Sequence, residues 1–456
     1  MSPRRKSKPS PSDSSPLRPT VHPDAAGIDI GARQIYVAVP HDRCPRPVRC
    51  FDTFTDSLLA LRDWLKDCAI TTVAMESTGV YWIPLFQILE SAGIEVCLVN
   101  ARHCKNLPGR KTDVQDCQWL QYLHSVGLLR SSFRPTDQVC AVRCILRHRD
   151  SLVRAASRSV SHLHKAMTQM NVQLHHVISD LTGVTGLAIL QAILAGERDP
   201  LKLAALKDPR IKASRDTLAK SLRGDWRVEH LFTLQQTFEL WQKQQSLISA
   251  CDLQIASMLQ SFDTRADAGG APLPAPKSSH RKPQGNEPQF AAREDCFRVL
   301  GVDLTDVPGF QSPTVLLLLC ELGPDFASRF STAKHFASWL GLCPDNRITG
   351  GKVYSVRTRD VKSRVAEALR LAAQSLWRAN NYFGELFRRF KARLGSPKAI
   401  TAMAHKLARI LWHLLKFKQP FNPEVFRKEE DRMKLKKLAR LQNLANSMNY
   451  QLVPNP

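Results

Sequence analysis

The chain has 456 residues, which is enough for two or three domains that each bury a core of their own. Lysine and arginine number 65 against 41 aspartate and glutamate, and the net charge of +24 predicts a polyanionic partner, although charge alone does not separate DNA from RNA or an anionic membrane. No apolar run is long enough to span a bilayer, and residues 1–20 lack the apolar core of a signal peptide, so nothing in the sequence favours the membrane.

After a tail rich in Ser, Pro, Lys and Arg that is typical of disorder, the first regular elements are apolar strands. The segment Gly27-Ile-Asp29-Ile-Gly31 opens a β-branched, alternating run that continues through 35–39 and predicts a strand turning back on itself. Asp29 is the lone acid there. A carboxylate inside an apolar strand is costly unless it meets a metal or another cation.

A second acid follows a second strand, and two more begin a helix. The segment 71–79 predicts a strand that ends in the acid Glu76, just before a turn. A helix at 82–91 and a strand at 94–99 follow. Residues 111–123 then form an amphipathic run in which Asp113 and Asp116 share one helix face, next to Arg110 and Lys111. An isolated Asp-x-x-Asp usually lies on the solvent-exposed face of a surface helix. Four acids delivered from strand ends and one helix, however, predict a two-metal geometry.

The middle of the chain carries two heptad patterns, at 138–175 and 231–259, separated by a helical stretch and a turn near Gly224. The two helices that they predict could pair within one chain or across subunits, and the pattern leaves both open. Arg149 is the one break in the first pattern. Arg154 and Arg158 make this helix basic, so it is a candidate contact to a nucleic-acid backbone.

The twelve cysteines have no framework spacing, which indicates reduced thiols in a cytosol. Cys140, Cys144 and His148 recur every four residues on the first heptad helix. Because a zinc site usually needs four ligands and a turn, the favoured interpretation of this stripe is a buried helix face with small thiols.

Residues 263–288 shift to Gly, Pro, Ala and Ser, the composition of a flexible linker, and a last domain begins near residue 290. Inside it, Thr349 is followed by Gly350, Gly351 and Lys352, and further cations crowd the next stretch. A hydroxyl flanked by glycines and cations suits a nucleophile aimed at a phosphodiester, because there is room to approach and charge to stabilise the developing oxyanions. Many surface loops also contain such a motif.

Three motifs carry a family resemblance: G-I-D-I-G around Asp29, M-E-S-T-G-V-Y-W around Glu76, and N-A-R-H-C-K-N-L-P-G-R-K-T-D-V-Q-D at 100–116. In combination and order they resemble the DEDD-type transposases of bacterial insertion sequences, the IS-one-ten family and its IS-eleven-eleven group. The resemblance implies an α/β RNase H-like (RuvC-like) N-terminal domain, a helical coiled-coil middle that joins subunits, and a mainly α C-terminal transposase domain.

The same resemblance implies an activity and its partners. Asp29, Glu76, Asp113 and Asp116 would hold Mg²⁺ or Mn²⁺, and the family's C-terminal serine, in an S-G-G-K context, would attack DNA; here that position is Thr349, with Ser355 as a fallback. The expected partners are the DNA of the element ends and target, a structured guide RNA encoded by the element, and further copies of the chain in a dimer or tetramer whose subunits share active sites. The expected location is the bacterial cytoplasm, on the nucleoid.

The chain divides into six expected segments. They are a disordered basic tail at 1–22, the catalytic domain at 23–135, a coiled-coil segment at 136–262, a linker at 263–289, the transposase domain at 290–425 and a basic helical tail at 426–456. The residues expected to contact nucleic acid are Arg110, Lys111, Arg154, Arg158, Lys352, Arg357 and Arg359.

Three other functions are compatible with parts of the pattern. A metal-dependent junction nuclease would use the four acids with water as the nucleophile and form no covalent intermediate. An actin-like ATPase or sugar kinase also begins with Asp-x-Gly, as at Asp29 and Gly31, but no later glycine-rich adenosine motif follows. A degenerate element protein would bind DNA without cutting it, and the intact acidic set argues against this.

Overall fold

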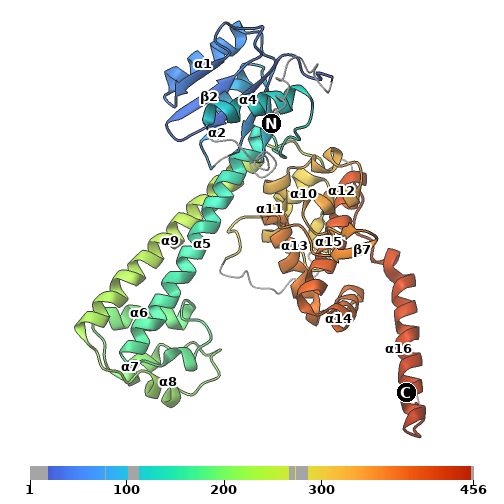
Figure 1. Ribbon diagram of the computed structural model, residues 1–456. Coiled ribbons are helices and arrows are strands. Elements are labelled where there is room, and N and C mark those ends of the chain that lie inside the picture. Colours follow the sequence, from blue (N-terminus) through green and yellow to red (C-terminus); the bar gives the residue numbers. More distant parts are fainter. Residues whose placement is uncertain (1–18, 78, 101–111, 267–272, 274–285, 453–456) are drawn as a thin grey trace, which may run out of the picture. The chain divides into compact units, whose positions relative to one another are not determined.

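The computed structural model describes residues 19–77, 79–100, 112–266, 273 and 286–452 (Figure 1). The chain divides into two compact units, Met1–Arg134 and Pro135–Pro456. Within the described ranges, no helix is long and apolar enough to cross a membrane. Residues 1–18 of the expected basic tail and most of the expected linker lie outside these ranges.

The first unit is built on a five-stranded sheet in the order β3-β2-β1-β4-β5. The strands are β1 Ala25–Ile30, β2 Gln34–Ala38, β3 Val48–Asp52, β4 Thr72–Glu76 and β5 Glu95–Val99. The first three form an antiparallel meander, whereas β4 pairs parallel with both β1 and β5. Parallel pairing of β1 with β4 places the carboxyl ends of these strands at the same edge of the sheet.

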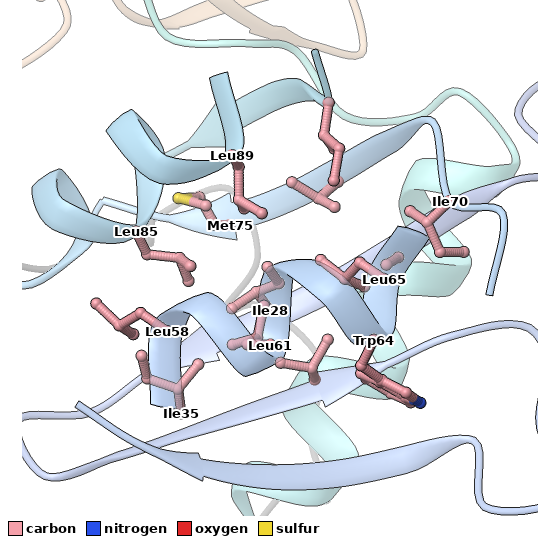
Figure 2. Close-up of a cluster of buried hydrophobic side chains, with 14 of the residues drawn as sticks. Ile28, Ile35, Leu58, Leu61, Trp64, Leu65, Ile70, Met75, Leu85 and Leu89 are labelled. Carbon is pink, nitrogen blue, oxygen red and sulfur yellow. The ribbon is translucent and has the colours of Figure 1, made fainter. Parts of the chain in front are cut away.

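Helices cover both faces of the sheet. Alternate residues of β1, such as Ile28, enter a core with α1 (Thr55–Asp67) and α2 (Trp82–Ser91), which Figure 2 shows around Leu61 and Leu85. The intervening residues of β1 face α4 (Asp113–Ser125), which packs on β1, β2 and β4. The strand period of two therefore separates a structural face of β1 from the face that carries Asp29.

Sequence inspection did not predict β3 or α1. β3 has the sequence Val-Arg-Cys-Phe-Asp with exposed and half-buried side chains, so it lacks the apolar alternation of the other strands. The helix α1, in contrast, does carry a helical pattern, because Leu58, Leu61 and Leu65 are all buried at spacings of three and four.

The second unit begins with a long helical hairpin, α5 (Asp137–Gln169) and α9 (Val228–Gln260). The two helices run antiparallel and pack along their length within one chain, since Gln138 bonds to Ser261 and Ser159 bonds to Gln244. Shorter helices close the far end of the hairpin around an apolar core. They are α6 Val184–Leu194, α7 Pro200–Ala205 and α8 Arg215–Ser221.

Arg149, the break in the heptad pattern, has a structural explanation. Its buried guanidinium donates two hydrogen bonds to the buried carboxylate of Asp252 on α9 and also bonds to the Asn286 carbonyl. The Gln289 backbone N–H donates to Asp252 at 3.2 Å. This pairing joins α5 to α9, and loss of either partner would leave the other charge buried and uncompensated.

The cysteine stripe on α5 is not the core face that its spacing predicted. Cys144 is exposed and Cys140 is half-buried, whereas Val139, Val142 and Leu146 are buried. The expectation of a buried thiol face is therefore wrong. The apolar side chains one or two positions away fill the core instead.

The remainder of the second unit is mainly helical and gathers around α15 (Ser396–Phe417), whose buried face packs on three neighbouring helices. The other elements are α10 Ala292–Leu300, α11 Ser312–Leu322, α12 Ala333–Trp339, β6 Arg347–Thr349, β7 Lys352–Ser355, α13 Arg364–Ser375, α14 Tyr382–Leu394 and α16 Arg427–Ser447. Among the described residues of α16 none is buried.

Candidate active site

Two of the four predicted acids lie at one edge of the sheet. Asp29 is the penultimate residue of β1, and Glu76 is the last residue of β4. Because Ile28 pairs with Met75 in the parallel register, Asp29 and Glu76 follow side by side at the carboxyl ends of adjacent strands. Both side chains are half-buried.

Gly27 brings α4 to the same place. A Cβ atom at Gly27 would lie 2.2 Å from the backbone oxygen of Cys117 and 2.2 Å from the backbone nitrogen of Gln121, so only glycine permits this contact between β1 and α4. The Gln121 side chain donates a hydrogen bond to the Ala25 carbonyl at 3.2 Å. The glycine that opens the first motif thus fixes the helix that carries the other two acids.

Asp113 and Asp116 lie in the first turn of α4, where the helix dipole stabilises carboxylates. The cap is Thr112, whose side-chain oxygen accepts a hydrogen bond from the Gln115 N–H at 3.3 Å. Asp113 is exposed and Asp116 is half-buried. The local sequence therefore begins a helix at the point where its two acids can turn toward the sheet edge.

Three further carboxylates lie near enough to Asp29 for their charges to act on it. Burial raises the pKa of Asp29 to about 6, and the negative charges of Asp113, Asp116 and Glu76 contribute to the same rise. The pKa of the adjacent Cys117 thiol is raised to about 12 by burial and by Asp29, so this thiol stays neutral. Mutual repulsion among carboxylates favours a proton or a cation between them.

The residues fit a divalent cation by chemistry more than by preformed geometry. In the part of the chain that the structure describes, no three carboxylate, histidine or cysteine side chains form a group that could hold a metal ion as they stand. The donor set nevertheless consists of hard carboxylate oxygens, which are the ligands of Mg²⁺ and Mn²⁺, and its repulsion is of the sign that a cation relieves.

The second predicted site is a β-hairpin. β6 and β7 pair antiparallel, with Thr349 opposite Lys352, and the turn between them consists of Gly350 at φ 55° and Gly351 at φ 75°. Two successive positive φ values fit the tight hairpin turns that favour glycine. A Cβ atom at either glycine would have open space around it to 4 Å among the described residues, so the backbone conformation, not space, requires glycine. Thr349 is exposed beside this turn.

Ser355 lies at the other end of the same hairpin. It is half-buried opposite Arg347, and its hydroxyl accepts a hydrogen bond from the Arg357 N–H at 3.3 Å. Arg359 donates to the Ser338 carbonyl and hydroxyl at the end of α12, so its guanidinium is at least partly occupied in anchoring the hairpin. Thr349 is the more exposed of the two candidate hydroxyls.

The predicted nucleic-acid contacts that the structure describes fall on two surfaces. Arg154 and Arg158 are exposed one helical turn apart on α5, and Lys352 and Arg357 are exposed on or beside the hairpin. Arg110 and Lys111 lie outside the described residues.

Sequence inspection missed two residues that pack α4 against the sheet. Gly27 was noted only as part of a motif, although a glycine alternating with an acid on one strand face is a signal of close helix approach. His124 on α4 is buried, and its Nε2 lies 2.8 Å from the Thr72 hydroxyl on β4. A single histidine on a helix gives no sequence signal for such a contact.

Two family models match the chain. One for DEDD-type IS110 transposases, described as Transposase, matches residues 26–172. The other, described as Transposase IS116/IS110/IS902 family, matches residues 303–388. No curated protein matches the sequence. The first match contains all four acids, and the second contains the β6–β7 hairpin.

Proposed function

We propose, because the chain belongs to the IS110 family of DEDD transposases, that it cuts and rejoins DNA at the ends of its own insertion element with two separate chemical sites. The chain is a DNA transposase, that is, a recombinase, and DNA is its partner. The four acids hold a divalent metal, Mg²⁺ or Mn²⁺, and Thr349 supplies the attacking hydroxyl.

The strand order supports an RNase H-like, RuvC-like class for the first unit. Three antiparallel strands followed by two parallel ones, with helices on both faces, is the order expected of that class. The carboxyl ends of β1 and β4 and the start of α4 are where such a domain would carry its acids.

The observation that carries the metal role is the placement of Asp29 beside Glu76 at the ends of adjacent strands, with α4 packed against β1. Burial and the charges of the three other carboxylates raise the pKa of Asp29, which agrees with that placement. A bound divalent cation would polarise a phosphodiester and stabilise charge on its oxygens. The protein positions the acids. The β1–β4 register places Asp29 beside Glu76, and the contact at Gly27 packs α4, which carries Asp113 and Asp116, against β1.

The hydroxyl chemistry has a balanced form. The Thr349 oxygen attacks phosphorus and forms a new P–O bond while the bond from phosphorus to one deoxyribose oxygen breaks, and that oxygen leaves with a proton. A second DNA hydroxyl later attacks the phosphothreonine and regenerates Thr349. The exposure of Thr349 beside a glycine turn and next to Lys352 supports the role, since the phosphate can approach without a steric barrier.

Guidance by a structured RNA and assembly into a dimer or tetramer complete the proposal. The charge of +24 and the exposed pair Arg154 and Arg158 support a second polyanion besides DNA. The α5–α9 hairpin, already paired within one chain, is proposed to pack against a second hairpin when subunits join.

A covalent adduct tests the proposal. The full-length protein is incubated with guide RNA, Mg²⁺ and a nicked suicide DNA of its element end, and adducts are mapped by mass spectrometry. A DNA strand attached to the peptide of Thr349 is the expected result. Thr349→Ser should keep the adduct because the hydroxyl stays, whereas Thr349→Val keeps the shape and should lose it.

Two other results would change the assignment. An adduct mapped to Ser355 would move the nucleophile to the other end of the hairpin. Normal cleavage by Thr349→Val without any adduct would leave water as the nucleophile, as in a junction nuclease.

A further inference from the structure

The second unit contains a large groove that is lined neither by the four acids nor by Thr349. It runs from the base of the β6–β7 hairpin along α14 and α15 to the short helix η5 (Pro423–Phe426) and the start of α16, and we call it the α15 groove. Its volume is about 1700 Å³. Pockets for small molecules typically measure ~300–1,000 Å³, so this groove suits a chain-like ligand.

The charge of the α15 groove is strongly positive. The basic residues that line it are Arg357, Arg393, Lys398, Lys406 and Arg409, and the one acid among its described lining residues is Glu429. That acid is already engaged, because Glu429 accepts hydrogen bonds from Tyr382 and, at 3.4 Å, from Lys406. The cations therefore outnumber the available anions, and a polyanion is the complementary ligand.

Aromatic rings line the same groove. Phe417 is 55% exposed and stacks at 5.8 Å on His413, while Phe421 stacks at 6.2 Å on Phe426. Tyr354, at the hairpin end, is 84% exposed. Exposed rings interleaved with cations are the combination that binds single strands, because unpaired bases stack on rings while phosphates meet the cations. A duplex keeps its bases inside and offers no face to these rings.

We propose that the α15 groove holds a single strand of DNA that leads from the base of the hairpin, so that the strand being cut is held next to the hairpin that carries the nucleophile. The proposal rests on the proposed function for its choice of DNA, since Ser355 and Arg357 of the hairpin region line one end of the groove. Phosphates meet Lys398 and Arg409, and bases stack on Phe417.

Binding of a short oligonucleotide tests the groove without any cleavage. Fluorescence anisotropy measures the affinity of the full-length protein for a single-stranded DNA of about 12 nucleotides, within the length that such grooves cover. The Lys398→Ala/Arg409→Ala variant should bind about tenfold more weakly, and the slope of log K against log salt should fall by about 1.4, which is about 0.7 for each lost phosphate contact.

Matched variants separate charge from stacking and from general folding. Phe417→Leu should weaken binding severalfold with an unchanged salt slope, because stacking does not release counterions. Lys416→Ala removes an exposed cation from the same helix outside the groove and should change the affinity less than about twofold. The conservative pair Lys398→Arg/Arg409→Lys should restore binding if charge is what matters.

Several results would overturn the assignment. Unchanged affinity in Lys398→Ala/Arg409→Ala, an equal loss in Lys416→Ala, or a clear preference of the groove for RNA or duplex of the same sequence would each do so. The outcomes are distinguishable from a failure of the proposed function. If the protein forms the adduct but the groove variants bind DNA normally, only the assignment of the groove is rejected. If binding depends on the groove but no adduct forms, only the assignment of the nucleophile is rejected.

Discussion

The acidic edge of the first unit and the hairpin of the second present reactive groups in opposite ways. Asp29 and Glu76 are half-buried at the ends of paired strands, and their surroundings raise the pKa of Asp29 to about 6. Thr349 is exposed beside two glycines with open space around them. One site is defined by packing, and the other by backbone conformation.

This difference indicates which job each site can do. Carboxylates that must hold a cation need fixed mutual positions, which a sheet and a packed helix supply. A hydroxyl that must meet a large polyanion needs access, and a hairpin supplies that while its turn limits the backbone conformations. Steric substitutions should therefore cost more stability at the first site than at the second.

The largest expected effect is loss of cleavage when one carboxylate is removed. Asp113→Ala or Asp29→Ala should lower DNA cleavage about 100-fold or more, because several kcal/mol of charge stabilisation depend on the metal site. Binding of nucleic acid should remain nearly intact, because the basic surfaces are untouched. Cleavage of labelled element ends and a gel-shift assay measure the two properties.

Glu95→Ala is the control for that experiment. Glu95 begins β5 and pairs with Thr72, at the end of the sheet opposite to Glu76, and it is exposed. This variant should cleave as the wild type does. Full activity of Asp29→Ala in Mg²⁺ would remove the acidic edge from the mechanism.

Two glycine substitutions compare packing with conformation directly. Gly27→Ala places a methyl group 2.2 Å from the backbone of α4, so α4 must shift, at a cost of about 3 kcal/mol. Gly351→Ala meets open space and costs about 1–2 kcal/mol, through its left-handed conformation alone. Thermal unfolding should show the larger loss for Gly27→Ala.

A further substitution sharpens the comparison. Gly351→Asn should lose less stability than Gly351→Ala, because asparagine tolerates a positive φ. No rescue of this kind exists at Gly27, where φ is ordinary and the contact is steric. Equal stability of Gly27→Ala and wild type would mean that α4 does not depend on this approach to β1.

The sequence predicted those elements of the first unit whose apolar pattern lies within one short segment. Alternating apolar residues marked β1, β2, β4 and β5, and the family motifs led to the transposase assignment that the two family models confirm. The roles of the four acids and of Thr349 stay predictions, as do the six segment bounds. β3 was missed because its exposed side chains carry no period-two pattern.

The features that sequence could not supply are contacts between distant residues. The heptad patterns fitted helices that pair within one chain and helices that pair across subunits equally well. In the structure, contacts such as the ion pair of Arg149 with Asp252 join α5 and α9 within one chain. The α15 groove likewise joins residues that lie far apart in the sequence, such as Tyr354 and Glu429, and no single stretch reveals it.

A pH effect of intermediate size is expected in the first unit, at His124 on α4. Burial, with a smaller effect of His22, lowers the pKa of His124 from 6.5 to about 4, and His124 is 5% exposed. Between pH 6.5 and about 4, His124 is therefore protonated in the unfolded chain but neutral in the folded chain. The free energy of unfolding rises with pH across this window, and the contribution of neutral His124 is complete above pH 6.5. The loss on acidification is at most about 3 kcal/mol, from about 1.36 kcal/mol for each pKa unit.

Hydrogen exchange of the α4 amides, corrected for the intrinsic rate, measures this local effect in the full chain. Protection should fall from about pH 6.5 to about pH 4.5 in the wild type. In His124→Gln, which cannot take up a proton, the fall should be smaller. An equal fall in both proteins would assign the pH effect to other groups.

The smallest expected effect concerns the basic face of α5, and it tests whether an exposed surface outside either site still contributes to binding. Arg154→Ala/Arg158→Ala should weaken binding of guide RNA and duplex DNA about tenfold and reduce the salt slope on the duplex by about 1.8, which is about 0.9 for each lost contact. Both side chains are exposed, so the α5–α9 core and the oligomeric state measured by light scattering should not change. Arg154→Lys/Arg158→Lys keeps the charge and should keep the slope, because counterion release depends on charge and not on the shape of the head group. An unchanged slope in the alanine variant would show that α5 does not contact a phosphate backbone, and dissociation into monomers would show that this face joins subunits instead.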